Sequence, residues 1–229
     1  MTAKRRNGRG PRSTARGARP LTRERIVAEA LALVNEAGLA GLTTRKLGAR
    51  LGVEAMSIYH HFPSKQHLLD ALVDHAIATV PVEAAAGNPE TRLRRLVDDY
   101  RAMAWRFPKL YPLIALHRLN TPMGVRFIES VLTLIHALSP DPRFVAQSFR
   151  ALGYYLTGAA LDETAGYASG PSAVDAVSDD YIAQECPRLS AAAAYFKPEW
   201  WDSTFELGLE TLLAGIRVAA KAGSSAQDG

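Results

Sequence analysis

The chain has 229 residues, 48% of them hydrophobic, and a single cysteine. This composition supports one or two domains with a real core, excludes wholesale disorder and leaves no internal disulfide. Because no apolar run approaches the ~18–20 residues of a membrane span, and because the basic N-terminus lacks the apolar core of a signal peptide, we expect a cytoplasmic protein with no membrane partner.

Positive charge is concentrated in the first third of the chain. Residues 1–75 hold 13 basic and 6 acidic residues, whereas residues 76–229 hold 14 and 17. Residues 1–20 carry seven basic side chains, no acidic one and almost nothing apolar, so we expect a disordered basic arm there. The asymmetry points to a polyanionic partner at this end; a solvated tail that aids solubility is the alternative.

Cap residues and breaks divide the chain into helices, because nearly every ordered stretch has apolar residues at helical spacing. In the first third, helices are expected from Thr22 to Gly38, from Thr43 or Thr44 to Gly52, over residues 54–61 and over residues 64–80. Further on, the cap-plus-proline pairs that open helices are Asn88-Pro89, Thr121-Pro122 and Asp141-Pro142. Residues 165–190, rich in Gly, Ser, Asp and Pro, predict a long mobile loop with at most a short helix, and a final helix follows over about 198–220.

Residues 42–61 have the pattern of a helix-turn-helix. Two short helices flank a tight turn at Leu51-Gly52-Val53, and Gly52 suits a turn that needs an unusual backbone conformation. Leu47 and Ile58 can bury between the two helices, which leaves the short, uncharged side chains of the second helix free to enter a major groove. A generic helical hairpin is the alternative.

The stretch from 26 to 73 resembles the TetR family of bacterial transcription regulators. The resemblance is carried by residues 41–47 (GLTTRKL), 51–54 (LGVE) and 58–62 (IYHHF). It implies a helix-turn-helix domain over residues 21–66 that binds double-stranded operator DNA. The positions that match DNA contacts in the family are Thr44, Arg45, Ala55, Met56, Ser57, Tyr59, His60 and Lys65.

The resemblance assigns different roles within that set. Arg45 matches a base-contacting arginine, whose fork suits a guanine edge, while Thr44, Tyr59 and Lys65 match phosphate contacts. The remaining positions match residues that face bases. The alternatives are packing for Met56 and, for the histidine at position 60, a phosphate contact.

Residues 152–163 and 205–210 resemble the C-terminal domain of the tetracycline-repressor branch of that family. The whole chain would then be all-α, with the N-terminal three-helix helix-turn-helix unit joined to a larger helical domain over 67–223 for effector binding and dimerisation. A homodimer would form through helices at about 142–164 and 199–220. The candidates for an effector pocket within residues 96–165 are Tyr100, Met103, Phe107, His117, Asn120, Phe127, Tyr154 and Tyr155.

Two side chains fall near the metal-binding positions of that branch, namely His117 and Asp162. Two residues far apart in sequence are weak evidence, so we expect no metal and no cofactor. No Gly-rich phosphate loop, Cys/His cluster or nucleophile elbow stands out, so we expect no enzyme.

The resemblance implies a sequence-specific transcriptional repressor that a small-molecule effector releases from its operator. The effector would favour a conformation in which the fourth helix swings and separates the recognition helices. A constitutive or architectural DNA-binding protein without an effector is the alternative, and an enclosed cavity within 96–165 is the observation that discriminates between them. The aromatic candidates could equally be plain core.

Overall fold

A computed structural model describes residues 20–82, 87–165 and 173–225. The predicted basic arm lies outside these ranges except for Pro20. Within them the chain is all-α, as predicted, and holds no strand. The helices are α1 (Arg23–Gly41), α2 (Thr44–Leu51), α3 (Ala55–Tyr59), α4 (Lys65–Ile77), α5 (Pro89–Arg106), α6 (Tyr111–Leu116), α7 (Pro122–His136), α8 (Pro142–Ala165), α9 (Asp179–Glu185), α10 (Pro187–Ala192) and α11 (Trp201–Ser225).

Short polar side chains start several of these helices. Each lies at the N-cap and accepts a hydrogen bond from a backbone amide of the first turn, an arrangement worth about 0.5–2 kcal/mol per helix. The capping residues are Thr22, Thr43, Ser64, Asn88, Thr121 and Ser178. For α2 the cap is Thr43, whose Oγ1 lies 3.2 Å from the amide of Lys46.

The first four helices form one small unit around a shared core. α1 packs on α2 and on α4, and α2 packs on α3. The predicted breaks at Gly38 and Gly52 are present, with φ of 68° and 70°, values that glycine adopts readily. The side chains that fill this core, each at most 2% exposed, are Ile26, Leu42, Leu47, Ile58, Phe62 and Leu68.

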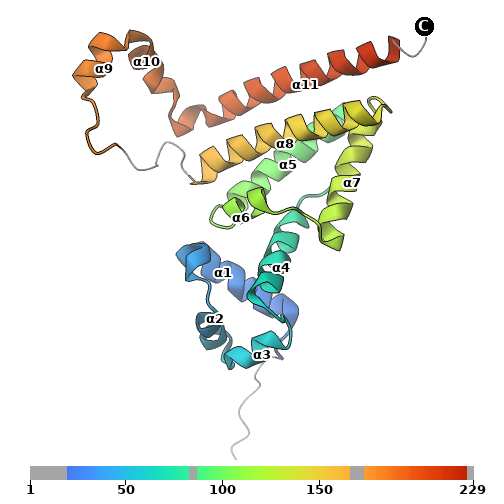
Figure 1. Cartoon of the computed structure of the whole chain (residues 1–229), viewed down its shortest axis with the longest axis vertical. Helices are drawn as coiled ribbons and strands as arrows, with labels where there is room; N and C mark the ends of the chain where they lie inside the picture. The colour runs from blue at the N-terminus through green and yellow to red at the C-terminus, as the bar shows by residue number, and fades with distance from the viewer. Residues whose placement is uncertain (1–19, 83–86, 166–172, 226–229) are drawn as a thin grey trace, which may run out of the picture.

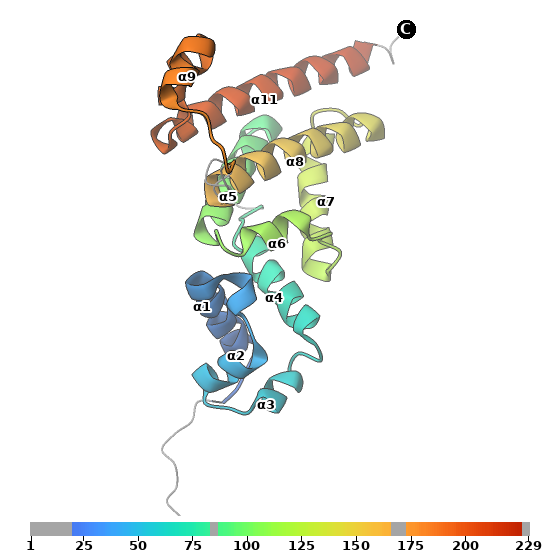
Figure 2. The same ribbon diagram turned by 60° about the vertical axis from the view of Figure 1, so that its left-hand side comes forward.

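The helix α4 joins this unit to the larger body. Its buried side packs against α1 and also against α5 and α7 (Figures 1 and 2). In the body, α8 packs against α5, α6 and α7, and α11 lies along its other side. No helix in the described ranges combines the length and the apolar character that crossing a membrane requires.

An ion-pair cluster around the buried Glu163 ties three helices of the body together. Arg101 on α5 reaches Glu163 on α8 through two hydrogen bonds of 2.9 Å, and Asp202 on α11 at 2.9 Å. The indole N–H of Trp105 donates to the same Glu163 carboxylate at 2.7 Å. Because the Glu163 side chain is 5% exposed, these donors are what makes a charge at that depth tolerable.

The prediction of a long loop with at most one short helix over 165–190 holds for residues 173–178 but is wrong beyond them. Two helices, α9 and α10, lie between Glu163 and α11, and the 3₁₀ turns η2 (Ala193–Tyr195) and η3 (Pro198–Trp200) follow them. Ser178 caps α9, and Pro187 lies in the first turn of α10. Residues that the sequence analysis took for loop residues therefore start helices. Residues 166–172 lie outside the described ranges. The short α6 was also not predicted from the sequence, although Pro112 lies in its first turn.

The close approach of the turn to α2 makes a prediction about Gly48. A Cβ on Gly48 would lie 2.8 Å from the carbonyl oxygen of Val53, whose own amide donates to the Gly48 carbonyl at 3.0 Å. Gly48→Ala should therefore lower the free energy of unfolding by about 1–3 kcal/mol. Urea unfolding at a fixed protein concentration measures this, with Ala49→Ser on the exposed side of the same helix as the control. Equal stability of the two variants would contradict the close approach.

Candidate functional site

The helix-turn-helix presents one side of α3 and the start of α2 to solvent. Leu47, Leu51 and Ile58 are buried between the helices, as the sequence predicts. The opposite side of α3 is accessible: Met56 is 66% exposed and Tyr59 is 37% exposed. This surface is a convex helix face, which is the shape that fits a major groove.

The structure leaves all eight predicted DNA-contacting residues accessible on this unit. Thr44, Ala55 and Ser57 are half-buried, and the other five are exposed. Within the described ranges no carboxylate pairs with Arg45 or Lys65, so both charges are available to an outside anion. The accessible positions, in chain order, are Thr44, Arg45, Ala55, Met56, Ser57, Tyr59, His60 and Lys65.

Two arginines of α1 form hydrogen bonds to the backbone of the helix-turn-helix. Arg25 donates to the carbonyl of Leu51 at the end of α2, with a distance of 3.1 Å. Arg23 donates to the carbonyl of His61 just after α3, and its guanidinium lies 4.1 Å from the centre of the Phe62 ring. Both carbonyls are at helix ends, where intrahelical partners are lacking, so the contacts satisfy them and set the angle between α2 and α3.

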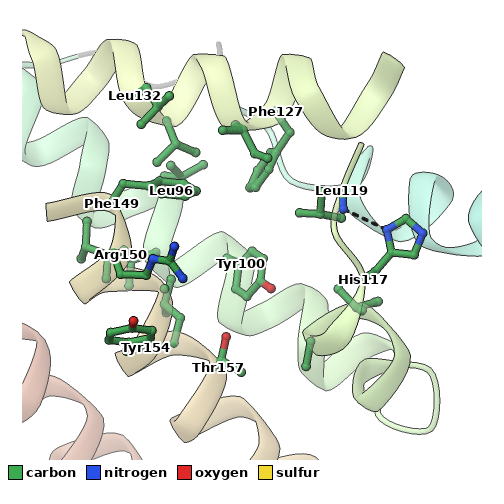
Figure 3. Close-up of a pocket in the computed structure, with 18 of the residues that line it drawn as sticks. Leu96, Tyr100, His117, Leu119, Phe127, Leu132, Phe149, Arg150, Tyr154 and Thr157 are labelled. Carbon is green, nitrogen blue, oxygen red and sulfur yellow. Dashed lines mark hydrogen bonds between the residues drawn. The ribbon is translucent and has the colours of Figure 1, made fainter. Parts of the chain in front are cut away.

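The body holds a cavity of about 910 Å³ between α5, α6, α7 and α8 that is partly open to solvent (Figure 3). Its size is that of a pocket for a drug-sized molecule. The wall is mainly aliphatic and aromatic. Its lining residues are Leu93, Leu96, Val97, Tyr100, Ile114, Ala115, His117, Arg118, Leu119, Phe127, Ile128, Val131, Leu132, Ala146, Phe149, Arg150, Leu152, Gly153, Tyr154, Leu156 and Thr157.

Four of the eight predicted effector-binding residues line this cavity: Tyr100, His117, Phe127 and Tyr154. The other four, which are Met103, Phe107, Asn120 and Tyr155, lie outside it. Met103 and Phe107 are 2% and 5% exposed and belong to the core of the body. Helical spacing predicts an inward side, but it does not distinguish a core position from a cavity wall.

His117 uses both ring nitrogens within the protein. The amide of Leu119 donates to Nδ1 at 3.0 Å, so Nδ1 carries no proton and Nε2 is the N–H that points at Asp70 Oδ1, 3.1 Å away. Asp70 is on α4. The wall of the cavity is thus hydrogen-bonded to the helix that joins the body to the helix-turn-helix.

The segment between α6 and α7 is closely constrained around this histidine. Leu119 has a φ of 50°, a left-handed conformation that non-glycine residues rarely adopt. A Cβ on Gly124 would lie 2.4 Å from the Leu119 carbonyl oxygen, so only glycine lets α7 start this close. At the far end of the segment, the Thr121 hydroxyl donates to Asp74 Oδ1 on α4.

Sequence reasoning missed the polar residues that α8 sends into the cavity. Figure 3 shows the Arg150 guanidinium extending over the Tyr154 ring, and the Thr157 hydroxyl directed toward Tyr100. The signal was present as an i, i+4, i+7 spacing along α8, which puts Arg150, Tyr154 and Thr157 on one side of the helix. Without the neighbouring helices, that spacing does not say whether this side faces solvent or a cavity.

A buried hydroxyl lies behind the cavity wall. Tyr111 is fully buried, and its hydroxyl makes no hydrogen bond of normal geometry within the described chain, although the hydroxyls of Tyr100 and Thr157 are its polar neighbours. The ring lies edge-on to Tyr100, with 6.2 Å between the ring centres. Burial raises the pKa of both tyrosines, so both are neutral phenols that can donate a hydrogen bond.

No metal centre is built from the described residues. Across residues 20–82, 87–165 and 173–225, no group of three His, Cys, Asp or Glu side chains is placed to hold an ion. Asp162, paired with His117 as a weak candidate in the sequence, does not line the cavity. Both nitrogens of His117 are already engaged by protein groups.

A second hollow of about 540 Å³ lies between α8 and α11. Small residues line it together with larger side chains such as Phe144 and Tyr155. The Tyr155 hydroxyl donates to the carbonyl of Phe205 at 2.5 Å. Leu207 and Val218 on α11 are 71% and 69% exposed. This side of the molecule therefore exposes more apolar surface than a finished exterior normally does.

Comparisons with known proteins agree with this arrangement. Residues 26–72 match the family model "Bacterial regulatory proteins, tetR family", and residues 81–220 match "Tetracyclin repressor-like, C-terminal domain". The tetracycline repressor protein class A from transposon 1721 of Escherichia coli is 31% identical over 201 residues, which cover 83% of this chain and 88% of that protein.

Solved structures share the fold along most of the chain. A possible TetR family transcriptional regulator from Streptomyces coelicolor A3(2) superposes with a TM-score of 0.73 at 26% identity, over 86% of this chain and all of that one. ActR from Streptomyces coelicolor, solved in complex with (S)-DNPA, gives a TM-score of 0.69 at 26% identity, over 88% of this chain and 100% of that one.

The unpartnered hydroxyl makes a prediction about Tyr111. Tyr111→Phe should leave the free energy of unfolding unchanged or raise it by up to about 1 kcal/mol, because it removes a buried donor without a partner. Tyr155→Phe, the matched control, should lower it by about 1 kcal/mol, because it breaks the hydrogen bond to Phe205.

The same tyrosine fixes a pH dependence. Because burial raises the pKa of Tyr111, the unfolded chain ionises first as the pH rises past ~10, so stability falls there. The free energy of unfolding of Tyr111→Phe should fall less steeply with rising pH than that of the parent chain. Urea unfolding between neutral and alkaline pH tests both points, and a loss of stability in Tyr111→Phe at neutral pH would show that its hydroxyl does have a partner.

Proposed function

Because this chain belongs to the TetR family of bacterial regulatory proteins, we propose that it is a transcriptional repressor that leaves its operator when a small molecule fills the cavity. The observation that carries this proposal is the hydrogen bond from the cavity wall to α4. A ligand in contact with His117 acts on a residue that is bonded to Asp70, on the helix that carries the DNA-contacting unit.

The DNA-contacting part of the proposal rests on the accessible side of α2 and α3. Arg45 would read a guanine edge, since its guanidinium is exposed and has no carboxylate partner in the described chain. Met56 and Ala55 would make apolar contacts in the major groove, and Lys65 would bind a phosphate. The positive balance of residues 1–75 supports a polyanionic partner here.

The release step would run through a short switch segment, residues 117–121. Its two ends bind α4 one turn apart, His117 to Asp70 and Thr121 to Asp74. A ligand that binds better when this segment shifts would pull α4, and with it the recognition helix, away from the DNA-competent position. The left-handed Leu119 at the centre of the segment supports this role, because strained backbone often lies at a switch.

A homodimer completes the proposal. Two copies would pack α8 and α11 together, which would cover the hollow lined by Tyr155 and Gly208 and the exposed Leu207 and Val218. Dimers place two recognition helices about one helical turn of DNA apart, so the operator would be a palindrome. The cavity favours effector-controlled repression over a constitutive DNA-binding protein, because the latter needs no space for a ligand.

The first test is binding to DNA from upstream of the gene that encodes the chain, followed in a mobility-shift assay. We expect a palindromic fragment to bind and one class of small molecule to release it. Arg45→Ala should weaken binding by about 1–3 kcal/mol and relax the sequence preference at one position. Lys65→Ala should weaken binding to all sequences and lower the log–log salt slope by about 0.9.

The control for both variants is Arg143→Ala, an exposed arginine at the start of α8 and far from α3 in Figure 1. Unaltered operator binding by Arg45→Ala would sink the assignment of the recognition surface. Binding that no small molecule releases would instead favour the constitutive reading.

The switch segment makes a separate prediction. Asp74→Ala removes the acceptor for Thr121 but leaves the Thr121 cap on α7 in place, since that cap uses the amide of Gly124 at 3.0 Å. The variant should bind the effector with little change, yet need about 5- to 150-fold more of it to release DNA, the range of ordinary allosteric coupling. The control is Thr79→Ala, which removes a hydrogen bond from the Thr79 hydroxyl to the carbonyl of Ala76 near the end of α4 and none to the switch segment. Parallel titrations of effector binding and DNA release measure the coupling, and equal release by both variants would argue against this route.

A further inference from the structure

The wall of the cavity carries positive charge and no negative charge. Its two ionic side chains are Arg118 and Arg150, and no Asp or Glu is among the described residues that line it. His117, the histidine of the lining, is hydrogen-bonded to the amide of Leu119 and to the carboxylate of Asp70. Both arginines are solvent-exposed, so a ligand meets positive charge at the solvent-accessible part of a wall that is otherwise mainly apolar.

Arg150 is the guanidinium best placed to use that potential. It extends from α8 over the ring of Tyr154, at 5.7 Å from the ring centre, toward the space between α5 and α7 (Figure 3). No Asp or Glu in the described ranges forms an ion pair with it. The planar fork of an arginine matches a carboxylate through two parallel hydrogen bonds, and Arg150 has that fork free.

The middle of the cavity suits a flat ring system. Tyr100 and Phe127 face each other with 6.3 Å between ring centres and 25° between ring planes. Phe149 and Tyr154 add two more rings on the α8 side. Aromatic walls of this kind favour aromatic ligands through stacked and edge-on contacts as well as through buried area.

Hydroxyl groups mark the end opposite the arginine. Thr157 follows Arg150 by seven residues on α8, which is about 10 Å along the helix. Its hydroxyl is directed toward Tyr100 (Figure 3), and the buried hydroxyl of Tyr111 belongs to the same group of hydroxyls. A polar group at the far end of a long ligand would join this group.

We propose that the effector is an elongated aromatic carboxylic acid. Its carboxylate pairs with Arg150, its ring system lies against Tyr100 and Phe127, and its far end carries a polar group that meets Thr157. This inference rests on the proposed function, because it names the chemical class of the molecule that the cavity senses.

The test uses a matched pair of fluorescent probes, anthracenecarboxylate and neutral anthracenecarboxamide, which differ in charge and hardly in shape. Fluorescence anisotropy with the full-length protein measures both affinities. We expect the carboxylate to bind about 10- to 100-fold more tightly than the amide, because a hydrogen bond to a charged group outweighs a neutral one. Arg150→Gln should abolish that preference and leave the amide within about twofold of the parent chain.

Arg143→Gln is the matched control, since Arg143 is exposed on the same helix, two turns earlier, and does not line the cavity. It should keep the full preference for the carboxylate. The preference of the parent chain needs no variant, so the test stands even if Arg150→Gln folds poorly. Equal affinities for the two probes, binding of neither, or an equal loss of both in Arg150→Gln would overturn the proposal.

A mobility shift with the same probes separates this inference from the proposed function. Arg150-dependent binding of the carboxylate that leaves the operator bound would support the ligand class and count against effector release. Release of the operator by neutral or cationic compounds, together with no preference for the carboxylate, would support effector release and overturn the ligand class.

Discussion

The helix α4 has to satisfy two packing partners at once, and the rest of the molecule depends on that constraint. Leu68, Leu72 and Val73 are nearly fully buried, and the helix packs against α1 as well as against α5 and α7. A helix that shares its buried side with both units cannot shift against one without disturbing the other, because cores pack too densely to deform smoothly. The two carboxylates of α4, Asp70 and Asp74, add hydrogen bonds to the segment beside the cavity.

Several surfaces of the single chain are chemically incomplete. The cavity wall leaves the exposed Arg150 without a carboxylate partner in the described ranges. The α8 and α11 side exposes Leu207 and Val218, and none of the residues of α9 or α10 is buried. A guanidinium without a carboxylate and exposed apolar side chains are both features that a bound molecule or a second copy would complete.

Local sequence determined the helices and the helix-turn-helix. Thr22, Thr43 and Ser64 each satisfy a backbone amide within one turn, so their effect does not depend on distant residues. Gly52 takes up the left-handed turn that the sequence predicts, and the family resemblance, which the family models confirm, rested on these same short-range patterns. The sequence failed for α9 and α10, whose residues have the composition of a loop but begin at Ser178 and Pro187, two helix-start signals.

The cavity was decided by the tertiary structure alone. The sequence identified an aromatic stretch, but the spacing of Tyr100 and Met103 along the helix predicts an inward side chain for both. Only the packing of α5 against α7 and α8 places Met103 in the core and Tyr100 in the cavity wall. The link from His117 to Asp70 joins residues 47 positions apart, and no local rule pairs them. Short-range hydrogen bonds and apolar spacing are properties of a single helix and can be read from its sequence, whereas a cavity is the space that several helices leave between them and exists only once they have packed.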